Sequence, residues 1–424
     1  MNRRTFLKGS GLLLGASFIG ASRAIGAEER IAPSERITVG LVGVGKMGHG
    51  HLGSLLSEGD VQLVAVCDVW QDRLQAAQES VEAHYAEEKR SGSFKGCSAT
   101  TDFMEVVERE DIDAVLTATP DHWHALVAAH AARAGKDVYC EKPLTRTIAE
   151  ARTLADTVKQ YGCVFQTGSQ QRSSREFRLA CEMVRNGRIG KVHTVHVNVG
   201  GPASECDLAP EPTPEVLDWD RWLGPAPWRP YNKILSPPSP RAEWPRWRYY
   251  WDYSGGGMTD WGAHHFDIAQ WGLDMDDSGP VEVIPPNEND VERLTYKYAN
   301  GVVMFHGGGK QGVDFIGDQG RITVNRGFLE TEPEGLDKEP IGPNEIHLYH
   351  SNSHRGNWIE CIKNRRPTIC TAEIGCRSVT VCHIGNIAYR LKRPLRWDPL
   401  AERFKDDEEA NRFLSVPMRS PWRV

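Results

Sequence analysis

The stretch Ile37-Thr38-Val39-Gly40-Leu41-Val42-Gly43-Val44-Gly45-Lys46-Met47-Gly48 decides the fold of this chain. Its pattern indicates a buried strand followed directly by a G-x-G-x-x-G turn and then by a segment of helical length. A second strand-like run, 61–67, ends at Asp68, about twenty residues beyond the turn. This order of strand, glycine turn, helix and acid-terminated strand predicts a dinucleotide-binding βαβ unit.

Each glycine of the turn has its own task. Gly43 permits the tight turn, Gly45 lets the backbone approach a pyrophosphate, and Gly48 lets the helix pack against the strand. The Asp68 carboxylate would accept hydrogen bonds from the ribose hydroxyls and repel a 2′-phosphate, so we expect NAD rather than NADP. The alternative interpretation is an ordinary glycine-rich turn. The predicted cofactor contacts in this unit are Gly43, Gly45, Lys46, Met47, Gly48 and Asp68.

Residues 1–27 have the pattern of a bacterial twin-arginine signal peptide. Arg3-Arg4 precedes an apolar run, 11–21, and small residues at 24–27 offer a cleavage site. The pattern predicts an exported, periplasmic protein that folds before export. A Sec signal or a membrane anchor is the alternative, but the apolar run is shorter than the roughly 20 residues that span a bilayer. We therefore expect no stable membrane insertion.

Composition indicates a large soluble protein. The chain has 424 residues, of which 40% are hydrophobic, and its formal charge is 50 minus 57, or -7. This mild acidity gives no reason to expect nucleic acid as a partner. The ten cysteines include no C-x-x-C pair, and those at 67, 140, 163 and 382 lie in apolar segments, so we expect mostly free thiols.

The pattern of the chain predicts two domains and an arm. Residues 35–160 alternate strands and helices, which is typical of a Rossmann domain with a parallel sheet. Residues 161–400 carry alternating polar and apolar strands, which predict an α+β domain with a large open, mostly antiparallel sheet. Residues 401–424 form an arm that packs on the body or on a neighbouring subunit.

Two more strands of the first domain lead into polar turns, at 119–124 and 141–143. Because ligands of parallel sheets bind beyond the carboxyl ends of the strands, both turns are predicted to line the nicotinamide side. The Lys142 ammonium could stabilise negative charge that develops on a substrate oxygen. The alternatives are an exposed turn before a capped helix and a surface lysine paired with Glu141. The predicted contacts here are Thr119, Pro120, His124, Glu141 and Lys142.

A stretch dense in tryptophan lies in the second domain. Eight of the 13 tryptophans fall between 219 and 271, interleaved with arginines and prolines. Flat apolar rings beside fork-shaped donors suit a polyhydroxylated ring. The alternative is a long loop whose aromatic side chains pack on one another or form a dimer contact. The predicted substrate contacts are Arg172, Trp251, Trp261 and His265.

The segment 254–267 carries the best candidates for acid-base chemistry. Asp260 and His264 are four residues apart, so on a regular helix they share one face. A histidine beside a carboxylate can accept a hydroxyl proton while hydride leaves the same carbon. Asp267 could also orient His264, and a capped helix with a structural histidine is the alternative. No third ligand follows at the usual spacing, so we expect no metal.

Taken together, these motifs resemble the glucose-fructose oxidoreductase/inositol dehydrogenase family, also called Gfo/Idh/MocA, from about Glu35 to Pro399. The tryptophan stretch and the segment 357–363 resemble a secreted branch of it. The resemblance implies a Rossmann domain, a second domain whose open sheet often mediates oligomers, and an E-K-P lysine and D-x-x-x-H pair at Lys142, Asp260 and His264. We therefore expect a homo-oligomer, a dimer or tetramer.

Three hypotheses about function follow. The first is an exported NAD-dependent oxidoreductase that moves hydride between a ring carbon of a sugar, glycoside or cyclitol and a tightly held cofactor, with Lys142, Asp260 and His264 as catalytic residues. The second is a redox-neutral glycoside hydrolase or lyase that oxidises the ring transiently, which suits a cofactor that cannot be regenerated after export. The third is a non-catalytic, NAD-containing sugar-binding protein.

Overall fold

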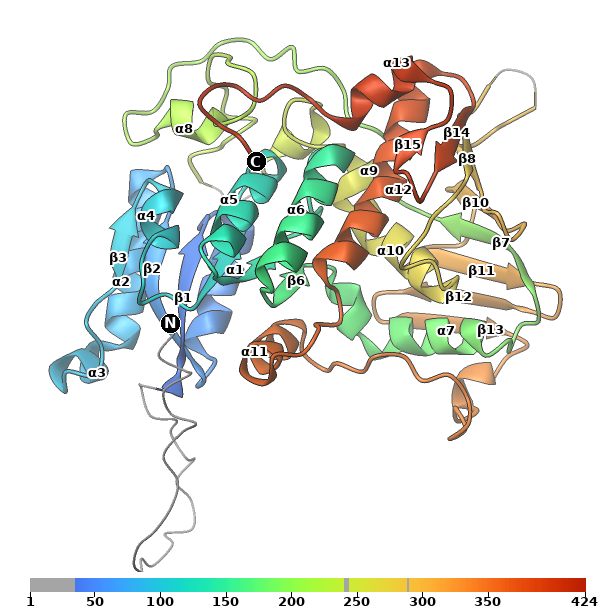
Figure 1. The fold of residues 1–424 in the computed structure, drawn as a ribbon, viewed down its shortest axis with the longest axis horizontal. Coiled ribbons are helices and arrows are strands. Elements are labelled where there is room, and N and C mark those ends of the chain that lie inside the picture. The colour runs from blue at the N-terminus through green and yellow to red at the C-terminus, as the bar shows by residue number, and fades with distance from the viewer. Residues whose placement is uncertain (1–34, 240–243, 288–289) are drawn as a thin grey trace, which may run out of the picture.

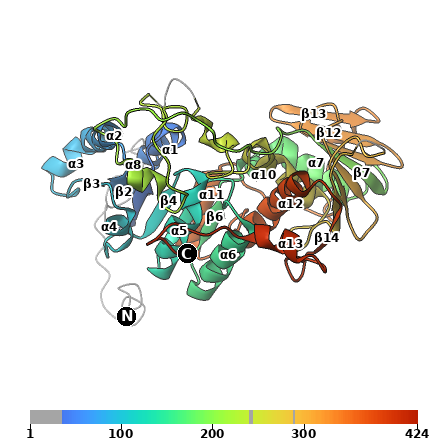
Figure 2. The same ribbon diagram turned by 90° about the horizontal axis from the view of Figure 1, so that it is seen from above.

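The computed structural model describes residues 35–239, 244–287 and 290–424. The predicted signal peptide, 1–27, lies outside these ranges. Within them the chain forms two sheets, each with its own helices, at opposite ends of an elongated molecule (Figures 1 and 2). The predicted fold class, a Rossmann domain followed by an α+β domain with an open, mostly antiparallel sheet, is confirmed.

The first sheet has six parallel strands in the order β3-β2-β1-β4-β5-β6, among the residues described. Apart from the edge strand β3, its strands are almost fully buried because helices cover both faces, as the apolar runs of the sequence require. The strands are β1 (Ile37–Val42), β2 (Val61–Cys67), β3 (Ser98–Thr100), β4 (Ala114–Thr117), β5 (Asp137–Cys140) and β6 (Phe165–Thr167). The helices are α1 (Lys46–Leu56), α2 (Gln71–His84), α3 (Ala86–Arg90), α4 (Phe103–Val107), α5 (Asp121–Arg133) and α6 (Ile148–Tyr161).

The first domain extends past the boundary at residue 160 that the sequence suggested. Helix α6 begins with a capping box between Thr147 and Glu150 and ends at Gly162, which has a φ of 67°. The chain then returns as β6, which pairs in parallel with β5. The sheet of the first domain therefore ends at Thr167.

The second sheet has nine strands in the order β13-β12-β11-β7-β10-β9-β8-β14-β15 in the described part of the chain. All neighbours are antiparallel except β7 and β10. The strands are β7 (Val192–Val197), β8 (Glu282–Ile284), β9 (Thr295–Lys297), β10 (Val303–His306), β11 (Val313–Gly317), β12 (Arg321–Asn325), β13 (Phe328–Glu332), β14 (Leu395–Asp398) and β15 (Arg403–Phe404).

Helices α7, α10 and α12 cover one face of the second sheet and join it to the first domain (Figure 1). Helix α12 packs on α6 of the first domain and on α10 of the second, and its residues belong to both cores. The α-helices of this part are α7 (Arg175–Arg185), α8 (Trp219–Leu223), α9 (Gly257–Asp260), α10 (Gly262–Gly272), α11 (His354–Asn364), α12 (Ala372–Leu391) and α13 (Glu408–Asn411). The short 3₁₀ helices are η3 (Gln170–Ser173), η4 (Arg246–Tyr249), η5 (Leu336–Lys338) and η6 (Arg412–Leu414).

All ten cysteines are free and most of them are buried, as the sequence predicted. No helix in the described ranges combines the length and the apolar character needed to cross a membrane. Within the same ranges, the His, Cys, Asp and Glu side chains form no group of three that could hold a metal ion.

Candidate active site

A cavity of about 680 Å³ lies at the carboxyl ends of β1, β2, β4 and β5, between the two domains. One end is formed by the glycine turn and Asp68, and the other by Lys142 together with residues of the second domain. A parallel sheet is expected to bind its ligand at this edge.

The glycine turn leaves room for a ligand. Gly43 has a φ of +88°, and a Cβ there would lie 2.8 Å from the backbone of Ala118. A Cβ on Gly48 would lie 1.9 Å from the Gly43 oxygen, so only glycine lets α1 start this close to β1. Gly45 lines the cavity, yet a Cβ there would meet no protein atom within 4 Å. The space beside Gly45 and the first turn of α1 therefore suits a pyrophosphate, and Lys46 and Met47 line the same wall.

Asp68 is held in place by the backbone around it. Its Oδ2 accepts a hydrogen bond from the Val44 nitrogen at 2.8 Å, and its Oδ1 accepts one from the Trp70 nitrogen at 2.9 Å. Burial raises the pKa of this carboxyl, while Arg73 and the two N–H groups act to lower it. The carboxyl lines the cavity and can accept further hydrogen bonds from ribose hydroxyls, so these acceptor oxygens fit an NAD ribose.

Thr119, Pro120 and His124 also line the cavity. The His124 ring lies between two loops, with Nδ1 2.8 Å from the Pro143 oxygen and Nε2 2.9 Å from the Thr119 oxygen. It therefore ties the loop after β4 to the loop after β5. Thr119 and Pro120 lie on the cavity side of this tie.

Glu141 fixes the backbone that presents Lys142. Its Oε1 lies 2.8 Å from His51 Nε2, and its Oε2 accepts a hydrogen bond from the Lys142 nitrogen at 3.1 Å. The Gln170 amide nitrogen donates to Oε1 at 3.2 Å. Although burial acts to raise the pKa of Glu141, these partners hold it below the usual value, so this acid is ionised.

Lys142 crosses the cavity to Asp260 of the second domain. Its Nζ donates to the Asp260 backbone oxygen at 2.9 Å and to Oδ1 at 2.6 Å, and both side chains are 17% exposed. Burial acts to raise the pKa of Asp260, but the Lys142 and Arg248 charges outweigh it and hold the pKa below the usual value. The carboxylate therefore orients the ammonium that faces the cavity.

Asp260 does not pair with His264. The helix expected to carry both is interrupted at Trp261, where α9 ends and α10 begins, so the two residues do not share one regular helical face. Asp267 does not orient His264 either, because its carboxylate binds Arg172.

Of the neighbours His264 and His265, His264 is the one that lines the cavity. Burial lowers its pKa well below the usual value, and the Lys142 and Arg326 charges lower it further, so the ring is neutral at pH 7. His265 does not line the cavity, and its ring stacks on Trp261 with centroids 5.8 Å apart at 12°. The sequence could not decide between these neighbours, because α10 is buried on every side.

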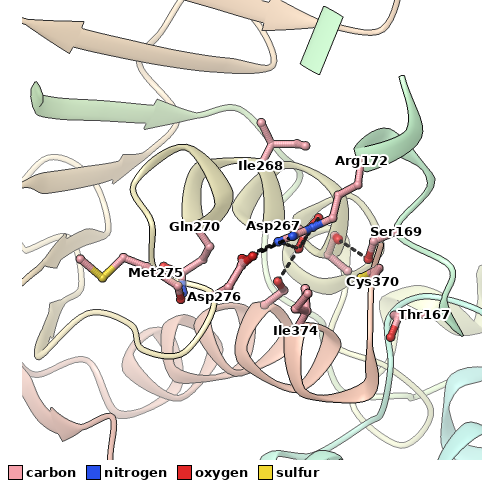
Figure 3. A network of polar contacts seen from close by, with 12 residues as sticks. Thr167, Ser169, Arg172, Asp267, Ile268, Gln270, Met275, Asp276, Cys370 and Ile374 are labelled. Atoms are coloured by element: carbon pink, nitrogen blue, oxygen red, sulfur yellow. Dashed lines mark hydrogen bonds and ion pairs between the residues drawn. The ribbon is translucent and has the colours of Figure 1, made fainter. Parts of the chain in front are cut away.

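Arg172 does not reach the substrate, contrary to our expectation. Its side chain is 1% exposed and lies in a buried ion-pair network with Asp267 and Asp276 (Figure 3). The Arg172 Nη2 donates to Asp267 Oδ1 at 2.8 Å and to Asp276 Oδ1 at 2.6 Å. Ser378 of α12 donates to the same Asp267 oxygen at 2.6 Å, so the network ties η3, α10 and α12 together.

The tryptophan stretch mainly packs on itself, which was the alternative interpretation. Trp219, Trp222 and Trp247 are buried with Trp70 in a small third core. Trp251 does not line the cavity, because it lies against the Arg390 guanidinium at 5.6 Å. The tryptophans of the stretch that do line the cavity are Trp222, Trp244, Trp247 and Trp261.

Arg326 and Trp422 are among the side chains that line the cavity and that sequence reasoning missed. Arg326, on the turn between β12 and β13, lies over the Trp261 ring at 4.8 Å. Trp422, on the C-terminal arm, lies edge-on to Trp123 with centroids 4.7 Å apart. Neither lies in a recognisable motif, and only tertiary packing brings them to the cavity.

The arm packs on the protein's own first domain (Figures 1 and 2). Its first part, including α13, packs on the second core, and residues 415–424 then cross to the first domain. The Arg419 nitrogen donates to the Pro225 oxygen, and Arg419 Nε donates to the Gly224 oxygen, both at 2.9 Å. These bonds hold Trp422 against the end of the cavity that Asp68 lines.

Comparison with known families agrees with this geometry. Residues 37–169 match the profile described as "Oxidoreductase family, NAD-binding Rossmann fold", and residues 200–424 match "Oxidoreductase family, C-terminal alpha/beta domain". The chain belongs to the Gfo/Idh/MocA oxidoreductase family. Its first domain is therefore an NAD-binding Rossmann domain of this oxidoreductase family, as the sequence predicted.

Individual relatives match the chain either over less than half of its length or at low sequence identity. The chain is 30% identical to myo-inositol 2-dehydrogenase of Thermotoga maritima over 39% of its length and 46% of that protein. It is 30% identical to alpha-N-acetylgalactosaminidase of Shewanella oneidensis, covering 45% and 44%. The matches thus span about half the length of these relatives. The WlbA dehydrogenase of Bordetella pertussis, solved with NADH and UDP-GlcNAcA, shares the fold with a TM-score of 0.57 at 18% identity, covering 86% and 99%.

Proposed function

We propose that this Gfo/Idh/MocA protein transfers hydride between a ring carbon of a sugar, glycoside or cyclitol and a tightly held NAD. The observation that carries the proposal is that Lys142, Asp260 and His264 meet in the same cavity as the glycine turn and Asp68. NAD, when bound, supplies the hydride acceptor. The relatives that act on inositol and on a glycoside support a polyhydroxylated ring as the substrate.

Side chains of the cavity would stabilise the substrate oxygen and accept its proton. Oxidation of a ring carbinol releases a hydride and a proton from the same C–O centre. Lys142 Nζ, held by Asp260, would donate a hydrogen bond to the substrate oxygen and stabilise its developing negative charge. The neutral His264 ring would accept the hydroxyl proton.

The test is to load the purified protein with NAD and incubate it with sugars or inositols deuterated at single ring carbons. Transfer of deuterium to the nicotinamide, seen by mass spectrometry after denaturation, supports the proposal. Failure of every ring position to exchange, with NAD shown to be bound, contradicts it and favours a non-catalytic sugar-binding protein.

A redox-neutral glycosidase is the second candidate, favoured by the likeness to the Shewanella glycosidase and by the arm that closes one end of the cavity. In this chemistry the oxidised ring carbon acidifies a neighbouring C–H, the aglycone leaves, water adds, and the carbonyl is reduced again. Release of 4-nitrophenol from a nitrophenyl glycoside without accumulation of NADH would select it. Accumulation of NADH in proportion to product would select simple oxidation.

Export and self-association are part of the proposal. The twin-arginine pattern at residues 1–27 supports export, and a fusion of this segment to a reporter enzyme would test it. Denaturing protein that was purified without added cofactor tests retention, since near-stoichiometric release of NAD is expected. Light scattering of the folded protein would show whether it is a dimer or a tetramer.

A further inference from the structure

The substrate end of the cavity carries more basic than acidic side chains. Lys142, Arg248 and Arg326 face Asp260, whose Oδ1 lies 2.6 Å from Lys142 Nζ and 3.6 Å from Arg248 Nε. One carboxylate thus meets three cations. Lys46 adds to this positive charge, because its Nζ and the Arg248 guanidinium lie over the same Trp244 ring at 5.0 and 4.9 Å.

The other acids nearby do not remove this excess. Glu141 is ionised and acts on Arg326, so it offsets one further positive charge, and three cations still face two carboxylates. Asp121 is enclosed and hydrogen-bonded to Ser254 Oγ at 2.5 Å, and burial raises its pKa to about 7, so it is partly protonated at neutral pH. A net positive charge therefore remains around the place where the substrate must sit.

Of these three cations, Arg326 is the one without a close ion pair in the described part of the chain, although the Asp260 and Glu141 charges act on it from farther away. No carboxylate in residues 35–239, 244–287 or 290–424 forms an ion pair with it within 4.0 Å. With the Gln171 amide turned so that its nitrogen donates to the His264 oxygen at 3.1 Å, the amide oxygen accepts from Arg326 Nε at 3.3 Å. This leaves both terminal nitrogens of the guanidinium free to donate.

The guanidinium is also held in a defined orientation. It lies over the Trp261 ring at 4.8 Å, and the same ring stacks on His265. Trp261 is therefore already engaged by protein groups, which makes it a support for Arg326 rather than a platform for a sugar. A planar guanidinium that stacks on an aromatic ring and keeps two parallel donors matches the geometry of a carboxylate, sulfate or phosphate.

We propose that the substrate carries an oxyanion substituent, a carboxylate or a sulfate or phosphate ester, and that Arg326 binds it through two parallel hydrogen bonds beside His264. This inference rests on the proposed function, because it concerns the substrate of the same cavity. A neutral sugar would leave the exposed Arg326 guanidinium without an anionic partner beside a positively charged cavity, so the site would favour an anionic substrate. The bound anion would also offset the positive charges that reduce the basicity of His264.

The test uses the NAD-loaded protein and matched pairs of sugars at constant ionic strength. The pairs are D-glucose with D-glucuronate, D-galactose with D-galacturonate, and D-glucose with its 6-sulfate and 6-phosphate. Binding is measured by calorimetry, and hydride exchange is measured with ring-deuterated sugars. Inorganic sulfate serves as a minimal probe, with thermal stabilisation as the readout.

At least one anionic sugar is expected to bind ten times or more as tightly as its neutral partner. Arg326→Gln should weaken binding of the anionic sugar about 10- to 100-fold and leave the neutral sugar and NAD unaffected, since hydrogen bonds to charged groups contribute that much. Arg326→Lys should retain the charge but lose the paired donors. Its affinity for the anionic sugar should therefore lie between those of wild type and Arg326→Gln. Arg412→Gln removes an exposed arginine outside the cavity and should change nothing.

Three binding results would overturn the inference. They are neutral sugars that bind as tightly as anionic ones, equal loss of both in Arg326→Gln, or, if no sugar of the panel binds, equal stabilisation of wild type and Arg326→Gln by sulfate. The carboxylate, sulfate and phosphate members of the panel show which anion is preferred. Hydride exchange with neutral sugars alone would overturn this inference and leave the proposed function standing. Anion binding that depends on Arg326, without exchange at any ring carbon, would support this inference and contradict the proposed function.

Discussion

Replacing Lys142 with methionine is expected to slow hydride transfer by about 10²- to 10³-fold and to leave folding and NAD binding almost unchanged. In the proposed reaction, Lys142 Nζ donates to the oxygen that gains negative charge, and its two contacts with Asp260 hold it at the cavity. Removal of one such preorganised donor costs roughly 2.7–4 kcal/mol in the transition state. That energy corresponds to the expected loss of rate.

Stability should change little for two reasons. The methionine stem retains most of the packing of the lysine stem. The Asp260 carboxylate, 17% exposed, keeps Arg248 Nε at 3.6 Å as a partner, so no isolated buried charge remains. We therefore expect a loss of at most about 1 kcal/mol in the free energy of unfolding, as for other partly exposed ion pairs.

The assay is single-turnover deuterium transfer from a ring-deuterated sugar to NAD, with bound NAD quantified in both proteins. Lys363→Met serves as the control, since that lysine pairs with Asp60 away from the cavity. A rate within threefold of wild type would refute the assigned role of Lys142. A loss of NAD binding that matches the loss of rate would show that the lysine serves the cofactor instead.

Four further predictions follow from the geometry. Gly45→Ala should fold with an unchanged Tm, because the residue has a φ of −64° and its Cβ meets no protein atom, yet it should weaken NAD binding at least tenfold in calorimetry. Arg172→Met should lower the free energy of unfolding in urea by about 3–5 kcal/mol, because Asp267 would stay buried with Ser378 as its remaining partner; a loss below 1 kcal/mol would contradict this. Stability should fall as the pH drops from about 6.5 to about 4, because burial lowers the pKa of His265, His354 and His383 to about 4. In this window the unfolded chain binds protons that the folded chain does not, so the stability contributed by the neutral buried histidines is complete above pH 6.5 and is lost below it. Acid titration of the Tm would show the decrease. Trp422→Ala should speed release of NAD several-fold in stopped-flow fluorescence, whereas Trp228→Ala, which alters an exposed ring outside the cavity, should not.

The fold could be predicted from local patterns. The apolar strand before Gly43 and the acid at the end of β2 define a parallel sheet and its binding edge, because these features depend on residues close in sequence. The hairpin of β9 and β10 follows from alternation around Asn300-Gly301 in the same way. The extra strand β6 was assigned to the wrong domain, since a single short apolar run carries no sign of which sheet it joins.

The site could be predicted only where motifs lie at strand ends. Lys142 and the glycine turn were found because their positions follow from the sheet. Arg172 was misassigned because an arginine in the sequence does not reveal whether carboxylates far along the chain, such as Asp267 and Asp276, will neutralise it. Arg326 was missed for the converse reason, because its lack of a partner exists only in three dimensions.

The C-terminal arm has a consequence for the order in which the molecule is made. Translation produces residues 415–424 after both domains, yet Trp422 and Arg419 complete the wall near Asp68. During synthesis the first domain can fold around its sheet while this end of the cavity is still open. The cavity wall beside Phe103 and Trp123 is therefore complete only once residues 415–424 have docked.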